Sequence, residues 1–238
     1  MLDLTRFLKG RGMRRAPCLF LLWLGVWLCC LSSTAFAALR YVDNEALNLR
    51  IGYPESVVYA ESRVADPIRP TLMMRLTSLR TLEHDDPAAC AAAVAERSAL
   101  AANKGLRPMD NEVPGSVSVL TVLRGVRAKT CLTLRKPDKA VVFELLAVFY
   151  LGDYRVVVTL AGPTRELIDE APGFFTKDHD APGVPVVWNS AGHKDVYEAY
   201  YQSLILNRSG PAASEWLAAF NAIVNGIQVL SQASAEKR

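Results

Sequence analysis

The chain has 238 residues, 51% of them hydrophobic and 21% charged, which is typical of a globular protein and excludes an intrinsically disordered one. Its formal net charge is +3, but five of the 27 basic residues and only one of the 24 acidic residues lie within the first 37 positions. The rest of the chain is therefore almost neutral. We expect no nucleic-acid partner, because phosphate binding requires a basic surplus that this part lacks.

The N-terminal segment has the three parts of a secretory signal. A basic stretch ends at Arg15, an apolar stretch runs over residues 18–31, and Ala35-Phe36-Ala37 provides small residues around a cleavage site. The apolar stretch is shorter than the roughly 20 residues that cross a bilayer. We therefore predict a signal peptide over residues 1–37 and a periplasmic or secreted protein. The alternative is that this segment is not cleaved and serves as a membrane anchor. We expect contact with a membrane only in that case, and only through this segment.

The next part of the chain predicts two strands and a helix. Alternating apolar and polar residues over 47–53 predict a half-buried strand that Pro54 ends. Residues 71–82 fit either a second strand or a helix, because both periodicities are present. Residues 88–103 are dominated by alanine, the best helix former, and Asp86 is placed to cap a helix there.

Two of the five cysteines, Cys90 and Cys131, lie outside the predicted signal peptide. An even number of cysteines in an oxidising compartment predicts a disulfide between them. Because Cys90 falls on the predicted helix and Cys131 on a predicted strand, the bond would join a covering helix to a sheet. The alternative is two separate buried thiols.

The second half of the chain predicts further strands and then helices. Residues 117–123 and 128–135 have strand patterns, and residues 171–185 carry three prolines and predict irregular structure. Two terminal helices are predicted over 194–206 and 211–230 from apolar residues at helical spacing. No repeat or long linker divides residues 38–238, so we expect one domain.

The stretch from Val141 to Ala161 predicts the centre of the fold. Gly152 and Asp153 fit a two-residue hairpin turn between two β-rich runs. That turn would set four rows: Leu151 with Tyr154, Phe149 with Val156, Ala147 with Val158, and Leu145 with Leu160. Both faces of this hairpin are largely apolar, whereas a sheet with one wet face alternates cleanly. We therefore predict an α+β fold in which helices cover both faces of an antiparallel sheet, an α/β/α sandwich.

The order of predicted elements resembles the PsbP-like superfamily, which comprises the photosystem II extrinsic P subunit and bacterial relatives including DcrB-like envelope proteins. The resemblance spans roughly residues 47–230. It is carried by Ile51-Gly52-Tyr53-Pro54, Gly125-Val126-Arg127-Ala128, residues 154–162 and residues 216–227. It implies an antiparallel sheet between helices and an accessory or binding role. The superfamily has no shared catalytic residues, so the resemblance implies no site residue.

The candidate residues for chemistry lie mainly in one loop. The chain has three histidines, and the polar residues that could assemble a metal site or a hydrolase site are Asp178, His179, Asp180, His193 and Asp195. No metal-binding spacing joins them, so a solvated loop is the simpler interpretation. The third histidine, His84, precedes Asp85 and Asp86. These two aspartates are better explained as capping residues of the helix that follows than as part of a site. Three tyrosines, Tyr197, Tyr200 and Tyr201, fit either a ligand-facing patch or helix-on-sheet core.

We expect no catalytic residue, no metal and no cofactor from these patterns. The favoured function is an exported, non-enzymatic protein that acts by binding another envelope protein or a small ligand, as an accessory or assembly factor. The alternative is an envelope hydrolase whose site is formed by the 171–195 loop.

Overall fold

The computed structural model describes residues 38–61, 69–104, 106, 111–123, 125–135, 142–174, 176–177, 185–186 and 194–230. Ala38–Arg238 form one compact unit, distinct from Met1–Ala37. The elements of this unit are β1 (Leu39–Asn44), η1 (Glu45–Leu47), β2 (Leu49–Pro54), β3 (Val58–Tyr59), β4 (Thr71–Ser78), α2 (Leu79–Asp85), α3 (Pro87–Ala102), β5 (Ser118–Val122), β6 (Val126–Arg135), β7 (Val142–Leu151), β8 (Tyr154–Ala161), α4 (Thr164–Glu170), η3 (Pro172–Phe174), β9 (Thr176–Lys177), β10 (Pro185–Val186), α5 (Lys194–Ile205), α6 (Pro211–Asn225) and β11 (Ile227–Val229).

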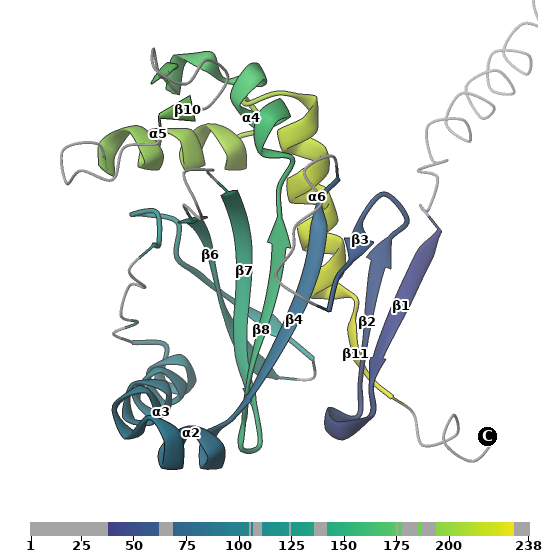
Figure 1. Cartoon of the computed structure of the whole chain (residues 1–238), viewed down its shortest axis with the longest axis vertical. Coiled ribbons are helices and arrows are strands. Elements are labelled where there is room, and N and C mark those ends of the chain that lie inside the picture. Colours follow the sequence, from purple (N-terminus) through teal and green to yellow (C-terminus); the bar gives the residue numbers. More distant parts are fainter. Residues whose placement is uncertain are drawn as a thin grey trace, which may run out of the picture. The chain divides into compact units, whose positions relative to one another are not determined.

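The main sheet has six strands in the order β3-β4-β8-β7-β6-β5 (Figure 1). All neighbouring strands are antiparallel except β3 and β4, which are parallel. A second sheet contains three strands in the order β1-β2-β11, and β9 pairs with β10. The predicted α+β class is confirmed, with the addition of one parallel pair and a separate three-stranded sheet.

The central hairpin forms with the predicted register. Leu151 pairs with Tyr154, and the rows continue along β7 and β8 to Leu145 and Leu160. Gly152 has a φ of 55°, a left-handed conformation that glycine adopts without strain. The two-residue loop therefore fixes which side chains share a face.

One face of the six-stranded sheet, called here the inner face, packs against α6 in the main core. It includes Phe143, Ala147, Phe149, Val156 and Val158, all with 0% exposure. Trp216 on α6 is also fully buried, and its Nε1 donates a hydrogen bond to the carbonyl of Leu160 at 3.2 Å. The other side of α6 packs on β2, so this helix lies between the two sheets.

The opposite face, called here the outer face, is also shielded from water. Cys131, Leu146, Val148 and Val157 form a second buried cluster on it. Helix α3 packs near the hairpin-turn end of this face, where Arg97 donates to the carbonyl of Gly152 at 3.3 Å. The prediction that helices lie on both faces is therefore confirmed.

The ambiguous segment 71–82 contains both predicted structures. Residues Thr71–Ser78 form β4, and α2 begins at Leu79. The change occurs at Ser78, whose hydroxyl accepts a hydrogen bond from the N–H of Thr81 at 3.4 Å and caps the helix. Helix α3 follows at once, capped as predicted by Asp86, which accepts from the N–H of Ala89 at 2.9 Å.

The last predicted helix ends earlier than the sequence pattern indicates. Helix α6 stops at Asn225, and residues 227–229 form β11 on β2 instead of a further helical turn. Ile227 continues the helical spacing, but it is buried as part of the sheet, opposite Ile51. No helix in the described part of the chain is long and apolar enough to cross a membrane.

Candidate functional site

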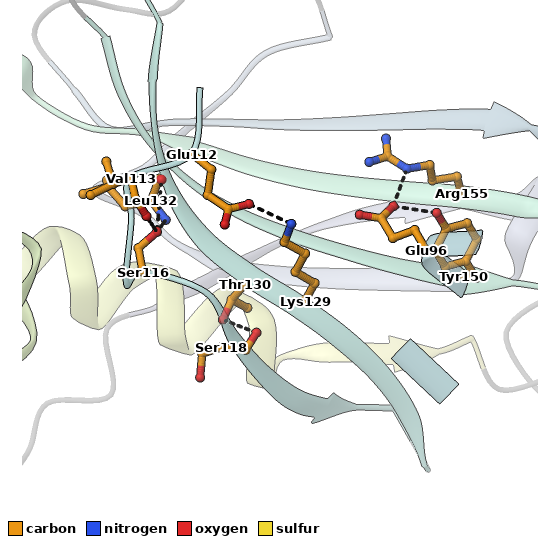
Figure 2. Close-up of polar contacts among 10 residues, drawn as sticks. All are labelled: Glu96, Glu112, Val113, Ser116, Ser118, Lys129, Thr130, Leu132, Tyr150 and Arg155. Carbon is orange, nitrogen blue, oxygen red and sulfur yellow. Dashed lines mark hydrogen bonds and ion pairs between the residues drawn. The ribbon is translucent and has the colours of Figure 1, made fainter. Parts of the chain in front are cut away.

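Five polar side chains gather on the outer face, between the sheet and the segments that cover it (Figure 2). They are Glu96 on α3, Glu112 in the α3–β5 connection, Lys129 on β6, Tyr150 on β7 and Arg155 on β8. We call them the outer-face polar cluster. They form two separate groups, and hydrogen bonds or ion pairs connect the members within each group.

The first group fastens α3 to the central hairpin. Tyr150 and Arg155 face each other across β7 and β8. The Tyr150 hydroxyl donates to Glu96 Oε2 at 2.6 Å, and Arg155 Nε donates to the same oxygen at 3.1 Å (Figure 2). One carboxylate thus holds both strands against the helix.

The second group is a buried ion pair. Lys129 Nζ lies 2.7 Å from Glu112 Oε2, and the two side chains are 0% and 2% exposed. Lys129 stands opposite Val148 in the sheet, among apolar residues of the outer face. Glu112 reaches it because its backbone forms an isolated bridge with Thr133 on the same strand, β6. Removing both charges from water is costly, and the short contact offsets that cost.

A hydroxyl completes the edge of the sheet beside this pair. Residues 111–113 form backbone hydrogen bonds with β6, and the chain then turns away before β5 pairs with the same strand. The ladder of backbone hydrogen bonds along this edge of β6 is therefore interrupted. The buried Ser116 hydroxyl fills the interruption, accepting from the N–H of Leu132 at 3.1 Å and donating to the carbonyl of Val113 at 2.6 Å (Figure 2). The connection that carries Glu112 is therefore fixed at a buried point.

The environment of the outer face keeps the Cys131 thiol and the Tyr150 phenol protonated. Burial, together with the hydrogen bond to Glu96, raises the pKa of Tyr150 well above its ordinary value. Burial also raises the pKa of the Cys131 thiol to about 12, with a further contribution from the charge of Glu112. A thiol and a phenol that hold their protons at neutral pH are poor nucleophiles and poor bases. The cluster is suited to holding strands and helix together.

The predicted disulfide is not formed. Cys90 and Cys131 are both free and buried. The Cys90 thiol donates to the carbonyl of Leu79 at 3.4 Å, close to the hairpin turn. Cys131 stands opposite Leu146, four residues up β7 from Tyr150, a distance of about 13 Å at the usual rise of a strand. The prediction of a helix-to-sheet bond was wrong because α3 meets the sheet at one end and Cys131 lies further along.

The other candidate residues are not brought into one site. His84 is exposed and its Nδ1 lies 2.9 Å from Asp85, on α2. His179, His193, Asp178 and Asp180 lie outside the described residues, and Asp195 falls in the first turn of α5, where its side chain is not described. Among the residues that the structure describes, no three metal-binding side chains lie together.

The tyrosines of α5 pack in the core, which agrees with the second of the two interpretations of the sequence, helix-on-sheet core. Tyr197 is 9% exposed and Tyr200 0%. The Tyr200 ring lies 5.5 Å from the ring of Phe143 and 5.6 Å from that of Phe174, between centroids. These contacts join α5 to β7 and η3.

The polar cluster was not found from the sequence. Lys129 alternates with apolar residues on its strand, which is typical of an ordinary wet face, and Arg155 is a single polar exception in a largely apolar hairpin. Glu96 and Glu112 lie in a helix and in a polar connection, and nothing local to them indicates a partner far away in the chain. Comparison of the chain with known proteins finds no family model, no curated protein and no solved structure that matches it.

Proposed function

We propose that this chain is an exported, non-enzymatic protein of the cell envelope that acts by binding, as an accessory or assembly factor. The observation that carries the proposal is the closed state of the outer-face polar cluster. Its Lys129–Glu112 pair is sealed from water, and Glu96 already binds both Tyr150 and Arg155. A substrate would have to displace these contacts before it could meet a reactive group.

Export is supported by the position at which the compact unit begins. That unit starts at Ala38, the residue that follows Ala35-Phe36-Ala37. The carbonyl of Ala38 already accepts a hydrogen bond from the N–H of Glu55 at 3.2 Å. Cleavage after Ala37 would release the folded unit without removing any of its strands.

A role in binding is also supported by the resemblance of residues 47–230 to the PsbP-like superfamily. Membership remains part of this proposal. Proteins of that superfamily supply accessory and binding functions on an antiparallel sheet between helices. The described fold has this general arrangement, with α3 on one face of the sheet and α6 on the other.

The export step is tested by sequencing the N-terminus of the protein recovered from its native host after cell fractionation. We expect a start at Ala38 and recovery from the envelope or the medium. A start at Met1 in the cytosolic fraction would contradict export.

The binding step is tested by photo-crosslinking in the native host. A photoreactive amino acid is placed at exposed positions such as Val94 and Leu206, which are 39% and 56% exposed, and at the buried Leu132 as a control. We expect crosslinks to a discrete envelope component from exposed positions only. Turnover of a hydrolase substrate that is lost in Glu96→Gln would instead assign catalysis to this face.

A further inference from the structure

Strand β1 is a regular element with little protection from solvent. It has six residues, and none of them is buried. It forms one edge of the three-stranded sheet, where β2 is its only neighbour among the strands that the structure describes (Figure 1). An edge strand with open backbone groups is a template for pairing with another strand.

The hydrogen bonds of β2 show which backbone groups of β1 face outward. Glu55 donates its N–H to the carbonyl of Ala38, so the row of Ala38 is a hydrogen-bonded one. Gly52 stands opposite Tyr41, but its N–H points away from β1, to the carbonyl of Gly226 at 3.4 Å. Bonded and non-bonded rows alternate in an antiparallel pair, and both observations give the same alternation.

The consequence is that Leu39 and Tyr41 direct their N–H and C=O groups away from β2. The side chains of these two residues are also exposed, Leu39 by 43% and Tyr41 by 52%. Outward backbone groups and exposed apolar side chains therefore coincide on the same two residues.

The charges beside them are already neutralised. Arg50 donates two hydrogen bonds to the carboxylate of Asp43, both at 2.7 Å, and its guanidinium carbon lies 5.4 Å from the centroid of the Tyr41 ring. Arg40 lies 3.8 Å from Glu55. A charged partner would gain little from this edge, whereas a second copy brings the same neutral pairs.

We propose that β1 pairs with β1 of a second copy of this chain, antiparallel about a two-fold axis at Tyr41. The two three-stranded sheets then form one continuous sheet of six strands. Such an interface uses the same surface on both copies and closes after two, so it does not propagate into fibres. The tyrosine rings of the two copies meet at the axis, as a cross-strand aromatic pair.

The charges and the length of β1 select this register. An axis at Arg40 would place that arginine opposite its own copy, and like charges directly opposite are destabilising. An axis at Val42 would place Leu39 opposite Glu45, which belongs to η1 and no longer to the strand. The axis at Tyr41 keeps residues 39–43 of both copies within strand structure.

The test is the mass of the purified protein, as its host produces it, measured by sedimentation equilibrium from 1 µM to 1 mM, about the range in which a small interface associates. We expect the average mass to rise with concentration towards twice the monomer mass. Tyr41→Lys places two ammonium groups at the axis and should weaken the association at least tenfold. Val229→Lys, on the opposite edge at 59% exposure, is the matched control and should change it less than twofold.

Leu39→Pro provides a second variant that does not depend on charge. The outward N–H of Leu39 forms no hydrogen bond with β2. Proline at this position therefore removes a donor that β1 of the second copy would use, and it leaves the pairing of β1 with β2 intact. It should also weaken association, with an unchanged circular dichroism spectrum. A protein that stays monomeric up to 1 mM, or a dimer that Tyr41→Lys and Leu39→Pro leave intact, would overturn the proposal.

Discussion

Lys129 and Glu112 meet at 2.7 Å with their side chains buried, although they come from a sheet strand and from the connection between α3 and β5. The pair holds the α3–β5 connection against β6 at the point where the backbone ladder is interrupted. The short contact between them offsets part of the cost of burying each charge. The pair therefore behaves as one unit of stability.

Removing one member of this pair should be strongly destabilising. We expect Lys129→Met or Glu112→Leu to lower the free energy of unfolding by about 3–5 kcal/mol, because each leaves the other charge buried without this ion pair. The double variant should lose far less than the sum of the two single losses, since neither charge remains. Urea denaturation of the three variants measures this. Single losses below about 1 kcal/mol would contradict the sealed pair.

The two thiols should be countable and unreactive in the folded protein. Denatured without a reductant, the part of the chain from Ala38 onward should release two free thiols to Ellman's reagent, because Cys90 and Cys131 are not bonded. In native buffer at pH 8 Cys131 should react slowly, since the thiolate is the reactive form and burial keeps its population small. Detection of no free thiol after denaturation would restore the disulfide.

Cys131 should also make the fold sensitive to alkali. Its folded pKa is raised from 9.0 to about 12, so above pH 9 the unfolded chain releases a proton that the folded chain retains. The stability that comes from this group is complete below pH 9 and is lost as the pH rises towards 12, by up to about 1.4 kcal/mol per pH unit. Cys131→Val should have a flatter stability curve between pH 9 and pH 10, roughly the window below tyrosine ionisation. Equal slopes for the two proteins would contradict the shift.

Gly162 should tolerate no side chain. A Cβ atom at this position would lie 2.8 Å from Trp216 Cε2 and 2.9 Å from Leu167 Cδ1. We expect Gly162→Ala to cost about 1–3 kcal/mol, as overpacking of a filled core does. In a double-mutant cycle the loss should be smaller in the Trp216→Phe background, where a single ring replaces the larger indole and the contact with Leu167 remains. Additive losses would show that the close approach to Trp216 is not the cause.

Glu170 should act as the cap of α6 from outside that helix. Its two carboxylate oxygens accept from the N–H groups of Ala212 and Ala213 at 2.7 and 3.1 Å, and Gly210 at the N-cap position has no side chain to do so. Glu170→Ala should lower stability by about 0.5–2 kcal/mol, and Glu170→Gln by less, because one acceptor remains. Glu166→Ala is the control, because Glu166 is exposed and lies on α4, the helix that also carries Glu170. Equal effects at the two positions would exclude a capping role.

The sequence was informative wherever the determining interaction is local. The turn at Gly152 sets the hairpin register, and Asp86 sets the start of α3, because each acts within a few residues. Segment 71–82 could not be assigned because its strand and helix periodicities are both real, and Ser78 divides it between them.

The rest depends on contacts between distant parts of the chain. Whether residues 227–229 continue a helix or join a sheet is decided by the open edge of β2, which the local pattern does not contain. The partner of Lys129 is likewise decided by the path of the connection that brings Glu112 to β6. The disulfide prediction failed for the same reason, since spacing along the chain does not give the position of α3 along the sheet.

Strand β2 lies between the first and the last strands of the compact unit, with β1 on one side and β11 on the other. Ile51 on β2 stands opposite Ile227 on β11. The pairing of β2, an early segment of the chain, is therefore complete only when β11, near the C-terminal end of the unit, is present. During synthesis, this sheet cannot close until the final helix and its following strand have emerged, and contacts so far apart in the chain form slowly. A truncation before Gly226 should therefore leave an incomplete, aggregation-prone chain rather than a shorter version of the same protein.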